Sequence, residues 1–157
     1  MRARRHGRHA PDLVPHSLSL TILALANPLK ARLAALPALA GWQVRLRTDS
    51  ADRSELPAAD LGCIGAGIAD SKTGAAMVAP EWSVVLMARR GESAADALDA
   101  AFAAVFESLH NWMPGQHGGR GWEPLRLVRV QEPIFTDVGV VGYELTFSTA
   151  ARYMGQQ

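Results

Sequence analysis

The amino-acid sequence predicts an α+β fold, in which two helices pack on a mostly antiparallel sheet of four to five strands and the chain closes with a β-hairpin. Two segments repeat apolar residues at helical spacing, and several others alternate apolar and polar residues as strands do. The predicted order is helix, strand, strand, strand, helix, strand, strand. Because strands and helices do not alternate regularly, a doubly wound parallel sheet is not expected.

The first helix is expected over residues 19–39, with an interruption. Asn27 followed by Pro28 is typical of an N-cap and a first helical turn, so the helix is predicted to kink or restart there. Pro37 and Gly41 are expected to end it. The apolar stripe of this helix consists of Leu25, Leu29, Leu33 and Leu36.

Three strands are expected between the two helices. Residues 42–47 (WQVRLR) alternate apolar and polar side chains, the pattern of a strand with one wet face. After a polar loop over 49–59, small and apolar residues alternate over 61–69, where three glycines indicate a bulge or a close backbone approach. A connection is expected over 70–79. Residues 82–88 are apolar on both faces and predict a central strand.

The second helix is predicted to begin at Ser93, which forms a near-capping box with Asp96, and to stop at Pro114 and Gly115. A flexible glycine-rich loop is expected over 116–121. Apolar residues recur along this helix at helical spacing and are the predicted structural core, namely Leu98, Phe102, Val105, Leu109 and Trp112.

The end of the chain is expected to form an antiparallel hairpin. Residues 125–130 (LRLVRV) are its first strand, and their alternation slips near Leu127 and Val128, as a bulge would cause. Turn residues over 136–139 precede the second strand, over 141–148. In that strand the odd-numbered side chains face one way and the even-numbered side chains face the other.

Charge divides the chain into two parts. Residues 1–17 are expected to be a flexible basic arm, and residues 18–157 a single α+β domain. Four arginines and no acid lie in the first eight residues, which leaves 12 basic against 15 acidic residues in the rest. Such an arm can contact nucleic acid or an anionic surface, but no basic and aromatic interleaving follows it, so fraying is the favoured interpretation. The arginines are Arg2, Arg4, Arg5 and Arg8.

The start of the chain also imitates a secretory signal peptide. An apolar run follows the arginines and ends at residues 24–26 (ALA), which resemble a cleavage site. Pro11, Asp12 and Pro15 separate the basic region from this run, so an ordinary first helix is favoured. Loss of the residues through Ala26 would identify the secreted alternative.

Composition excludes several classes of protein. The 157 residues suit one domain, and the 48% hydrophobic and 20% charged shares are ordinary for a globular chain, so disorder throughout is excluded. No apolar stretch approaches the ~20 residues of a membrane span, which argues against an integral membrane protein. The single cysteine, Cys63, excludes an internal disulfide and a cysteine-based zinc site.

A search for catalytic chemistry finds no complete set. Cys63 would be a nucleophile if His110 or His117 approached it, but a lone cysteine in an apolar strand is more often a core residue. The glycines over 62–67 precede no helix and those over 115–121 follow one, so neither group fits a nucleotide-binding loop. No catalytic, cofactor-binding or metal site is predicted. A small cytosolic enzyme using Cys63 stays open as an alternative.

Three landmarks occur in an order that resembles the tail terminator (tail completion) proteins of bacteriophages with long flexible or contractile tails, nearest to the Mu-like branch. They are residues 36–44 (LPALAGWQV), 109–114 (LHNWMP) and 143–147 (YELTF). The resemblance covers about residues 29–151. This sequence has Asn111 where glycine is expected in the family.

The resemblance implies a structural virion protein without enzymatic activity. It would form a ring, a hexamer, that caps the head-proximal end of the tail tube, ends tube polymerisation and provides the surface for head attachment. Such a ring needs a heterologous interface whose rotation closes. The implied partners are other copies of the chain, the tail-tube protein and a head-side connector or stopper. DNA would only pass through the lumen, and no membrane is involved.

The implied location is the neck-proximal end of the virion tail, after assembly in the host cytoplasm. Another head–tail joining component, or a tail-tube subunit, is the alternative within the same class. A tube subunit would polymerise into long stacks, whereas a terminator would stop at one ring.

The expected contact elements are the loop over 49–59, the glycine-rich loop over 116–121 with the strand entrance that follows it, and the hairpin loop around Asp137. Each of the loops can equally be an ordinary exposed connection. The tryptophan at the strand entrance is expected either to contact a subunit or to cover one end of the core, and the arginines of the next strand to face a partner or a lumen. The candidate interface residues are Arg53, Gly118, Gly119, Trp122, Arg126, Arg129 and Asp137.

Overall fold

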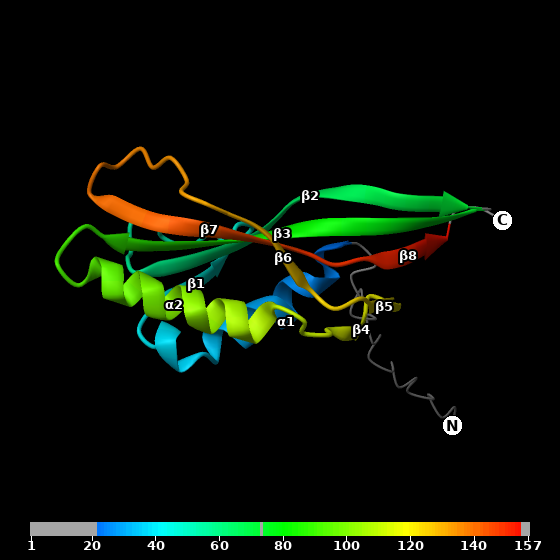
Figure 1. The fold of residues 1–157 in the computed structure, drawn as a ribbon, viewed down its shortest axis with the longest axis horizontal. Helices are drawn as coiled ribbons and strands as arrows, with labels where there is room; N and C mark the ends of the chain where they lie inside the picture. The colour runs from blue at the N-terminus through cyan, green and yellow to red at the C-terminus, as the bar shows by residue number, and fades with distance from the viewer. Residues whose placement is uncertain (1–21, 73, 155–157) are drawn as a thin grey trace, which may run out of the picture.

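A six-stranded sheet runs the length of the molecule, and the helices cover one of its faces (Figure 1). The computed structural model describes residues 22–72 and 74–154. The strand order is β1-β2-β3-β7-β6, and β8 pairs with the outer part of β3. The strands are β1 (Gln43–Leu46), β2 (Ala58–Lys72), β3 (Ala75–Arg89), β6 (Arg126–Gln131), β7 (Val140–Ser148) and β8 (Ala151–Met154). Only the β1–β2 pair of this sheet is parallel, so the predicted α+β class is confirmed.

The first helical region changes from 3₁₀ to α geometry between Leu25 and Ala26, next to the predicted site at Asn27 and Pro28, and it has a second break further along. Its segments are a 3₁₀ turn η1 (Ile22–Leu25), α1 (Ala26–Ala34) and a second 3₁₀ turn η2 (Pro37–Leu39). Asn27 is not an N-cap, because α1 begins one residue earlier. Pro28 is tolerated there since the first-turn N–H groups of a helix have no helical acceptor. The second break lies between the end of α1 at Ala34 and the start of η2 at Pro37, and the predicted residues 19–21 lie outside the described part of the chain.

The β2–β3 hairpin is much longer than predicted. The expected connection over 70–79 is wrong, because β2 continues to Lys72 and β3 begins at Ala75. Register shifts at Cys63/Gly65 and at Ile68/Asp70 absorb the irregular sequence pattern, and they confirm the predicted bulge. The outer part of the hairpin, residues 64–72 and 75–80, extends beyond α1 and α2 (Figure 1). We call this part the distal arm.

The expected flexible loop over 116–121 is a small hairpin instead. Its strands are β4 (Gly115–His117) and β5 (Arg120–Trp122). Gly118 and Gly119 form the turn with φ values of 62° and 73°. Positive φ at both central residues is what a two-residue hairpin turn of type I′ requires, which explains the glycine pair.

The second helix, α2 (Ala94–Leu109), confirms the prediction over most of its length. Its predicted capping box is wrong. Ser93 has helical backbone angles and its side chain makes no capping hydrogen bond, whereas a capping serine needs an extended backbone.

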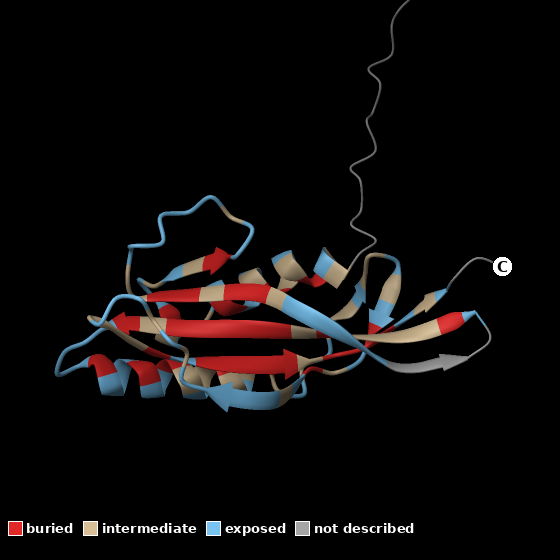
Figure 2. Cartoon of the chain, turned by 90° about the horizontal axis from the view of Figure 1, so that it is seen from above, coloured by how far each residue is buried: buried red, intermediate tan, exposed pale blue. Residues whose placement is uncertain are grey.

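The hydrophobic core lies between the helices and the covered face of the sheet (Figure 2). Leu98, Val105 and Leu109 are buried as predicted, and Phe102 and Trp112 are partly buried and pack against the same cluster. From the first helical region, the fully buried side chains are Leu25, Leu29 and Leu33. Because Leu25 belongs to the core, the segment that imitates a cleavage site is part of the folded domain. None of the described helices is long and apolar enough to cross a membrane.

The predicted C-terminal hairpin is formed by β6 and β7. Its register shifts between Leu127 and Arg129, at the place where the sequence alternation slips, so the predicted bulge is confirmed. A further strand, β8, follows and was not predicted.

Asn111 has a φ of 66° at the corner that follows α2, and its N–H donates to the Leu125 carbonyl at 2.7 Å. Left-handed backbone favours glycine, and asparagine tolerates it better than other residues. We expect Asn111→Gly to keep full stability and Asn111→Ala to lose ~1 kcal/mol of unfolding free energy. Urea denaturation measures both, with Asn27→Ala in α1 as the control. Equal midpoints for the glycine and alanine variants would contradict the backbone argument.

Candidate interaction surfaces

The residues considered for catalysis are not brought together. Partial burial raises the pKa of the Cys63 thiol, and its S–H donates to the Gly65 carbonyl at 3.4 Å. His110 Nδ1 accepts a hydrogen bond from the Leu127 N–H at 3.0 Å, and His117 Nε2 lies 2.8 Å from the Pro114 carbonyl. Each imidazole ring is therefore engaged with a nearby backbone group, His110 with the start of β6 and His117 with the residues before β4. Among the described residues, no group of three or more His, Cys, Asp and Glu side chains could hold a metal ion.

Two arginines clamp the loop over 47–57 onto the helix-free face of the sheet. Arg45, which is only 3% exposed, donates from Nε to Asp60 Oδ1 at 2.6 Å, and its Nη1 donates to two loop carbonyls. Arg53 Nη1 lies 3.4 Å from the same carboxylate, and its Nη2 donates to the carbonyls of Leu46 and Asp49 at 2.9 and 2.8 Å. The structure therefore gives the predicted interface residue Arg53 an internal role, while its side chain stays partly exposed.

The same loop carries an acid that is fully ionised at neutral pH. The Leu46 N–H donates to Asp49 Oδ2 at 2.8 Å, and the Lys30 ammonium lies 3.0 Å from that oxygen. These two donors hold the pKa of Asp49 below its usual value. The contact joins α1 to the loop after β1.

A second polar network is buried across the central strands of the helix-free face. Glu144, 8% exposed, accepts a hydrogen bond from Ser83 Oγ at 2.6 Å and another from Gln131 Nε2 at 2.5 Å. Arg47 Nη2 donates to Ser83 Oγ at 3.1 Å and lies 3.5 Å from the Glu144 carboxylate. Gly62 makes this arrangement possible, because a Cβ there would lie 2.3 Å from Arg47 Cδ. The network links β3, β7, β6 and the end of β1.

Both edges of the sheet are open in the described part of the chain. β1 pairs with β2 only as far as Leu61, and no described strand pairs with the outer edge of β6. No charged residue occurs between Leu61 and Ile68 on the first of these edges. Exposed apolar side chains lie on both edge strands, namely Ile64 and Ile68 on β2 and Val128 and Val130 on β6. Such edges are templates for strand pairing with another chain.

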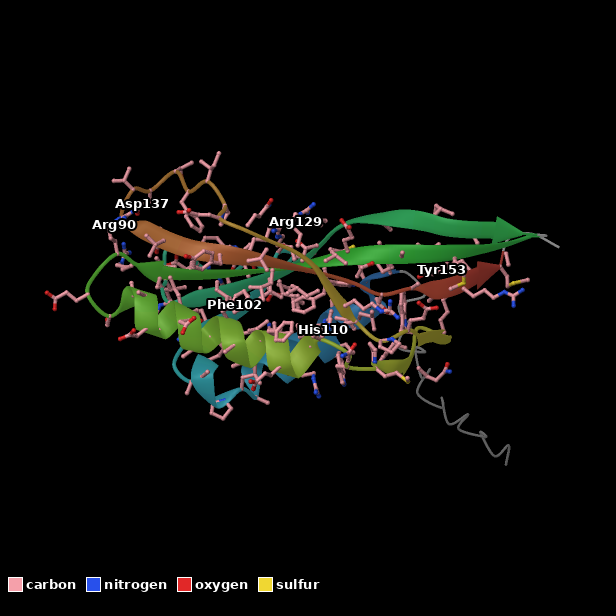
Figure 3. All side chains as sticks on the ribbon, viewed as in Figure 1. Arg90, Phe102, His110, Arg129, Asp137 and Tyr153 are labelled. Carbon is pink, nitrogen blue, oxygen red and sulfur yellow. The ribbon has the colours of Figure 1, made fainter. Side chains whose placement is uncertain are left out.

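The predicted interface arginines lie on or next to these open elements. Arg126 and Arg129 are exposed on β6, and Figure 3 shows Arg129 beside the crossing of β6 over the sheet. The structure therefore leaves these two side chains accessible to a partner.

The loop around Asp137 is tied to the end of β3 while it exposes apolar side chains. Arg90 donates to two carbonyls of this loop, those of Gly139 and Val138, at 2.8 and 3.1 Å. Asp137 Oδ1 accepts the Gly139 N–H at 2.8 Å, and Figure 3 shows Arg90 and Asp137 at the same end of the molecule. Because Ile134 and Val138 are almost fully exposed, this loop can offer an apolar contact to a partner.

Trp122 and the glycine hairpin cover one end of the core. Trp122 is 4% exposed, its Nε1–H donates to the His117 carbonyl at 3.0 Å, and its ring meets Tyr153 edge-on at 6.4 Å. The burial of Trp122 favours the predicted role of covering one end of the core over that of contacting a subunit. It leaves this side chain little surface for a neighbouring subunit. Gly118 and Gly119 remain at the exposed turn beside it.

The sequence did not predict a groove of about 740 Å³ between the first half of α2 and the ends of β6 and β7. Tyr143 shares its face of β7 with the core residues, as predicted, but it is 45% exposed and lines this groove. The apolar lining also includes Phe102 and Val130. The acidic lining consists of Asp96, Asp99 and Glu132.

Comparison with known proteins adds a structural likeness. No protein-family model and no curated protein sequence match the chain. The fold is similar to that of a chain in a solved structure described as "Virion of native gene transfer agent (GTA) particle". The TM-score is 0.61 and the sequence identity 20%, and the match covers 88% of this chain and 99% of that chain. At this identity the likeness shows a shared fold.

Glu144→Ala tests the buried network. The substitution leaves the Ser83 hydroxyl and the Gln131 amide without their acceptor, so we expect a loss of ~1–3 kcal/mol of unfolding free energy. Glu132→Ala, at an exposed position of the same hairpin, should change it by less than ~0.5 kcal/mol. Equilibrium denaturation gives both values, and equal midpoints would show that the network contributes nothing.

Proposed function

We propose that this protein is a structural component of a phage-like virion, which forms a homo-oligomeric ring, a hexamer, on the head-proximal end of the tail tube. The ring ends tube polymerisation and provides the surface for head attachment. The observation that carries the proposal is the fold shared with a chain of the gene transfer agent virion, because the match spans 99% of that chain.

The tail-terminator landmarks support the same function. Residues 36–44 form the corner into β1, residues 109–114 form the corner after α2, and residues 143–147 lie in the central strand β7. Asn111, where the family is expected to have glycine, has the positive φ that glycine adopts most easily. The departure at Asn111 is therefore conformationally equivalent to glycine, while the first eighteen residues have no counterpart in the family pattern.

The open sheet edges support a closed ring. A heterologous contact joins two different patches, and the outer edges of β2 and β6 lie on opposite sides of one sheet. Exposed apolar residues and free main-chain groups on both edges allow the sheet of one copy to continue into the next. The distal arm carries the first edge beyond the helices, toward a neighbour.

The two ends of the long axis are the proposed faces for the axial partners. The loop around Asp137 lies at one end and the distal arm with the β4–β5 hairpin lies at the other (Figure 1). One face would contact the tail-tube protein and the other a head-side connector or stopper. DNA would pass through the lumen, and the pairing of Arg45, Arg47 and Arg53 with carboxylates limits their grip on phosphates.

Two alternatives stay distinct from this proposal. A tail-tube subunit would share the open edges but would stack without limit. An enzyme using Cys63 would need a thiolate, whereas burial raises the pKa of this thiol and weakens it as a nucleophile at neutral pH.

The purified protein should form one ring with six times the 16.8 kDa subunit mass. Ile68→Lys puts a charge on the open edge of β2, so it should raise the dissociation constant of the ring by a factor of at least ~10, equal to ~1.4 kcal/mol. Met113→Lys, an exposed position outside β2 and β6, is the matched control. Native mass spectrometry and electron microscopy report the result. Long stacks would favour a tube subunit, and a monomer at all concentrations would contradict the ring.

Deleting the gene should give particles with tails of uncontrolled length, or tails that do not join heads. Electron microscopy of lysates measures tail length, and normal tails on filled heads would refute the proposed role. A Cys63→Ser copy should restore normal tails, because the ring needs no thiol chemistry. If the serine copy failed while folding normally, the enzyme alternative would be favoured.

A further inference from the structure

The groove between α2 and the β6–β7 hairpin combines an apolar floor with an acidic rim. Phe102, Val130 and Tyr143 line its floor, and the latter two are substantially exposed. Three carboxylates and one arginine, Arg90, make up the charged lining, so the groove is net negative. The carboxylates are those of Asp96, Asp99 and Glu132. A ligand that fits this surface is basic and carries some apolar side chains.

The N-terminal segment of the chain has this composition. Residues 1–18 contain four arginines and one acid, Asp12, and they include apolar residues such as Leu13 and Val14. Arginine pairs well with carboxylates and stacks on aromatic faces. The folded domain contains two such arginine–aromatic contacts. The Arg32 guanidinium lies 4.5 Å from the Trp112 ring centroid, and that of Arg120 lies 3.7 Å from the Tyr153 ring centroid.

The segment is long enough to reach the groove of its own chain. Thirteen residues lie between Arg8 and Ile22, where the described chain begins, and the fourteen Cα–Cα steps span up to ~46 Å when extended. α1 contacts the last turn of α2, where Arg32 Nε donates to the Ser108 carbonyl at 2.9 Å. The four residues of η1, the nine of α1 and the sixteen of α2 are only ~8 Å, ~13 Å and ~24 Å long. A path along both helices is therefore within reach.

We infer that the groove binds the arginine-rich N-terminal segment of the same chain. The carboxylates of α2 and β6 pair with the arginines, and the apolar floor accepts the side chains between them. Tethering raises the effective concentration of the segment to about the millimolar range, so weak surface contacts suffice to keep the groove occupied. The inference does not depend on the proposed ring.

Disulfide trapping in the full-length protein tests this contact. In a Cys63→Ser background, Gly7→Cys is combined with Ala95→Cys, whose residue lines the groove. The matched control combines Gly7→Cys with Ala103→Cys, an exposed alanine further along the same helix and outside the groove. These changes leave every charge in place. Disulfide formation in a glutathione buffer is followed on non-reducing gels and by intact mass.

We expect the groove pair to form a disulfide within one chain at least ~10-fold faster than the control pair at low salt. Most of this difference should disappear at ~1 M salt, where the Debye length falls to ~3 Å. Replacing the four arginines by serine should also remove it. Equal rates for the two pairs, or a product that is mainly a disulfide-linked dimer, would overturn the inference.

Discussion

The antiparallel pairing of β3 with β7 is the interaction on which the rest of the structure depends. It places Trp82 beside Phe147 and Val84 beside Leu145, and these pairs form the floor on which both helices pack. The strands approach so closely that a Cβ on Gly142 would lie 1.9 Å from the Leu86 carbonyl oxygen. The helices cover only one face of this pair, and the polar network around Glu144 lies on the opposite face. β2 and β6 flank the pair, and the outer edges of these two strands have no partner among the described residues.

Much of the fold could be predicted because periodicity reports local packing. The stripe of α2, the alternation of β1 and the bulge in β6 all follow from side chains that meet the core at regular spacing. The long β2–β3 hairpin could not be predicted, because its glycines weaken the strand pattern and residues 70–79 predict a connection. Pro80 lies where β7 ends and β8 begins, so its missing N–H falls in the gap between two partner strands.

The exposure of the candidate interface residues could be predicted only for a polar turn and for a strand with charged side chains. The loop around Asp137 and the strand of Arg126 and Arg129 are exposed as the sequence indicates, whereas Trp122 is buried because a hairpin, not a loose loop, precedes it. The groove beside Tyr143 had no sequence signal. It lies where the first half of α2 faces the ends of β6 and β7, and the spacing between packed elements cannot be read from the periodicity of either.

The uncharged run over residues 61–68 of β2 has a consequence for the free subunit in the cell. If the protein assembles as proposed, a subunit released before its neighbours exist presents an uncharged run over residues 61–68, which is flanked by Asp60 and Asp70, and an exposed run of this kind can pair with other strand edges. Solubility of the free subunit should therefore fall steeply as its concentration rises. If the protein is made in small amounts, and at the same time as its proposed partners, aggregation of the free subunit through this strand is reduced.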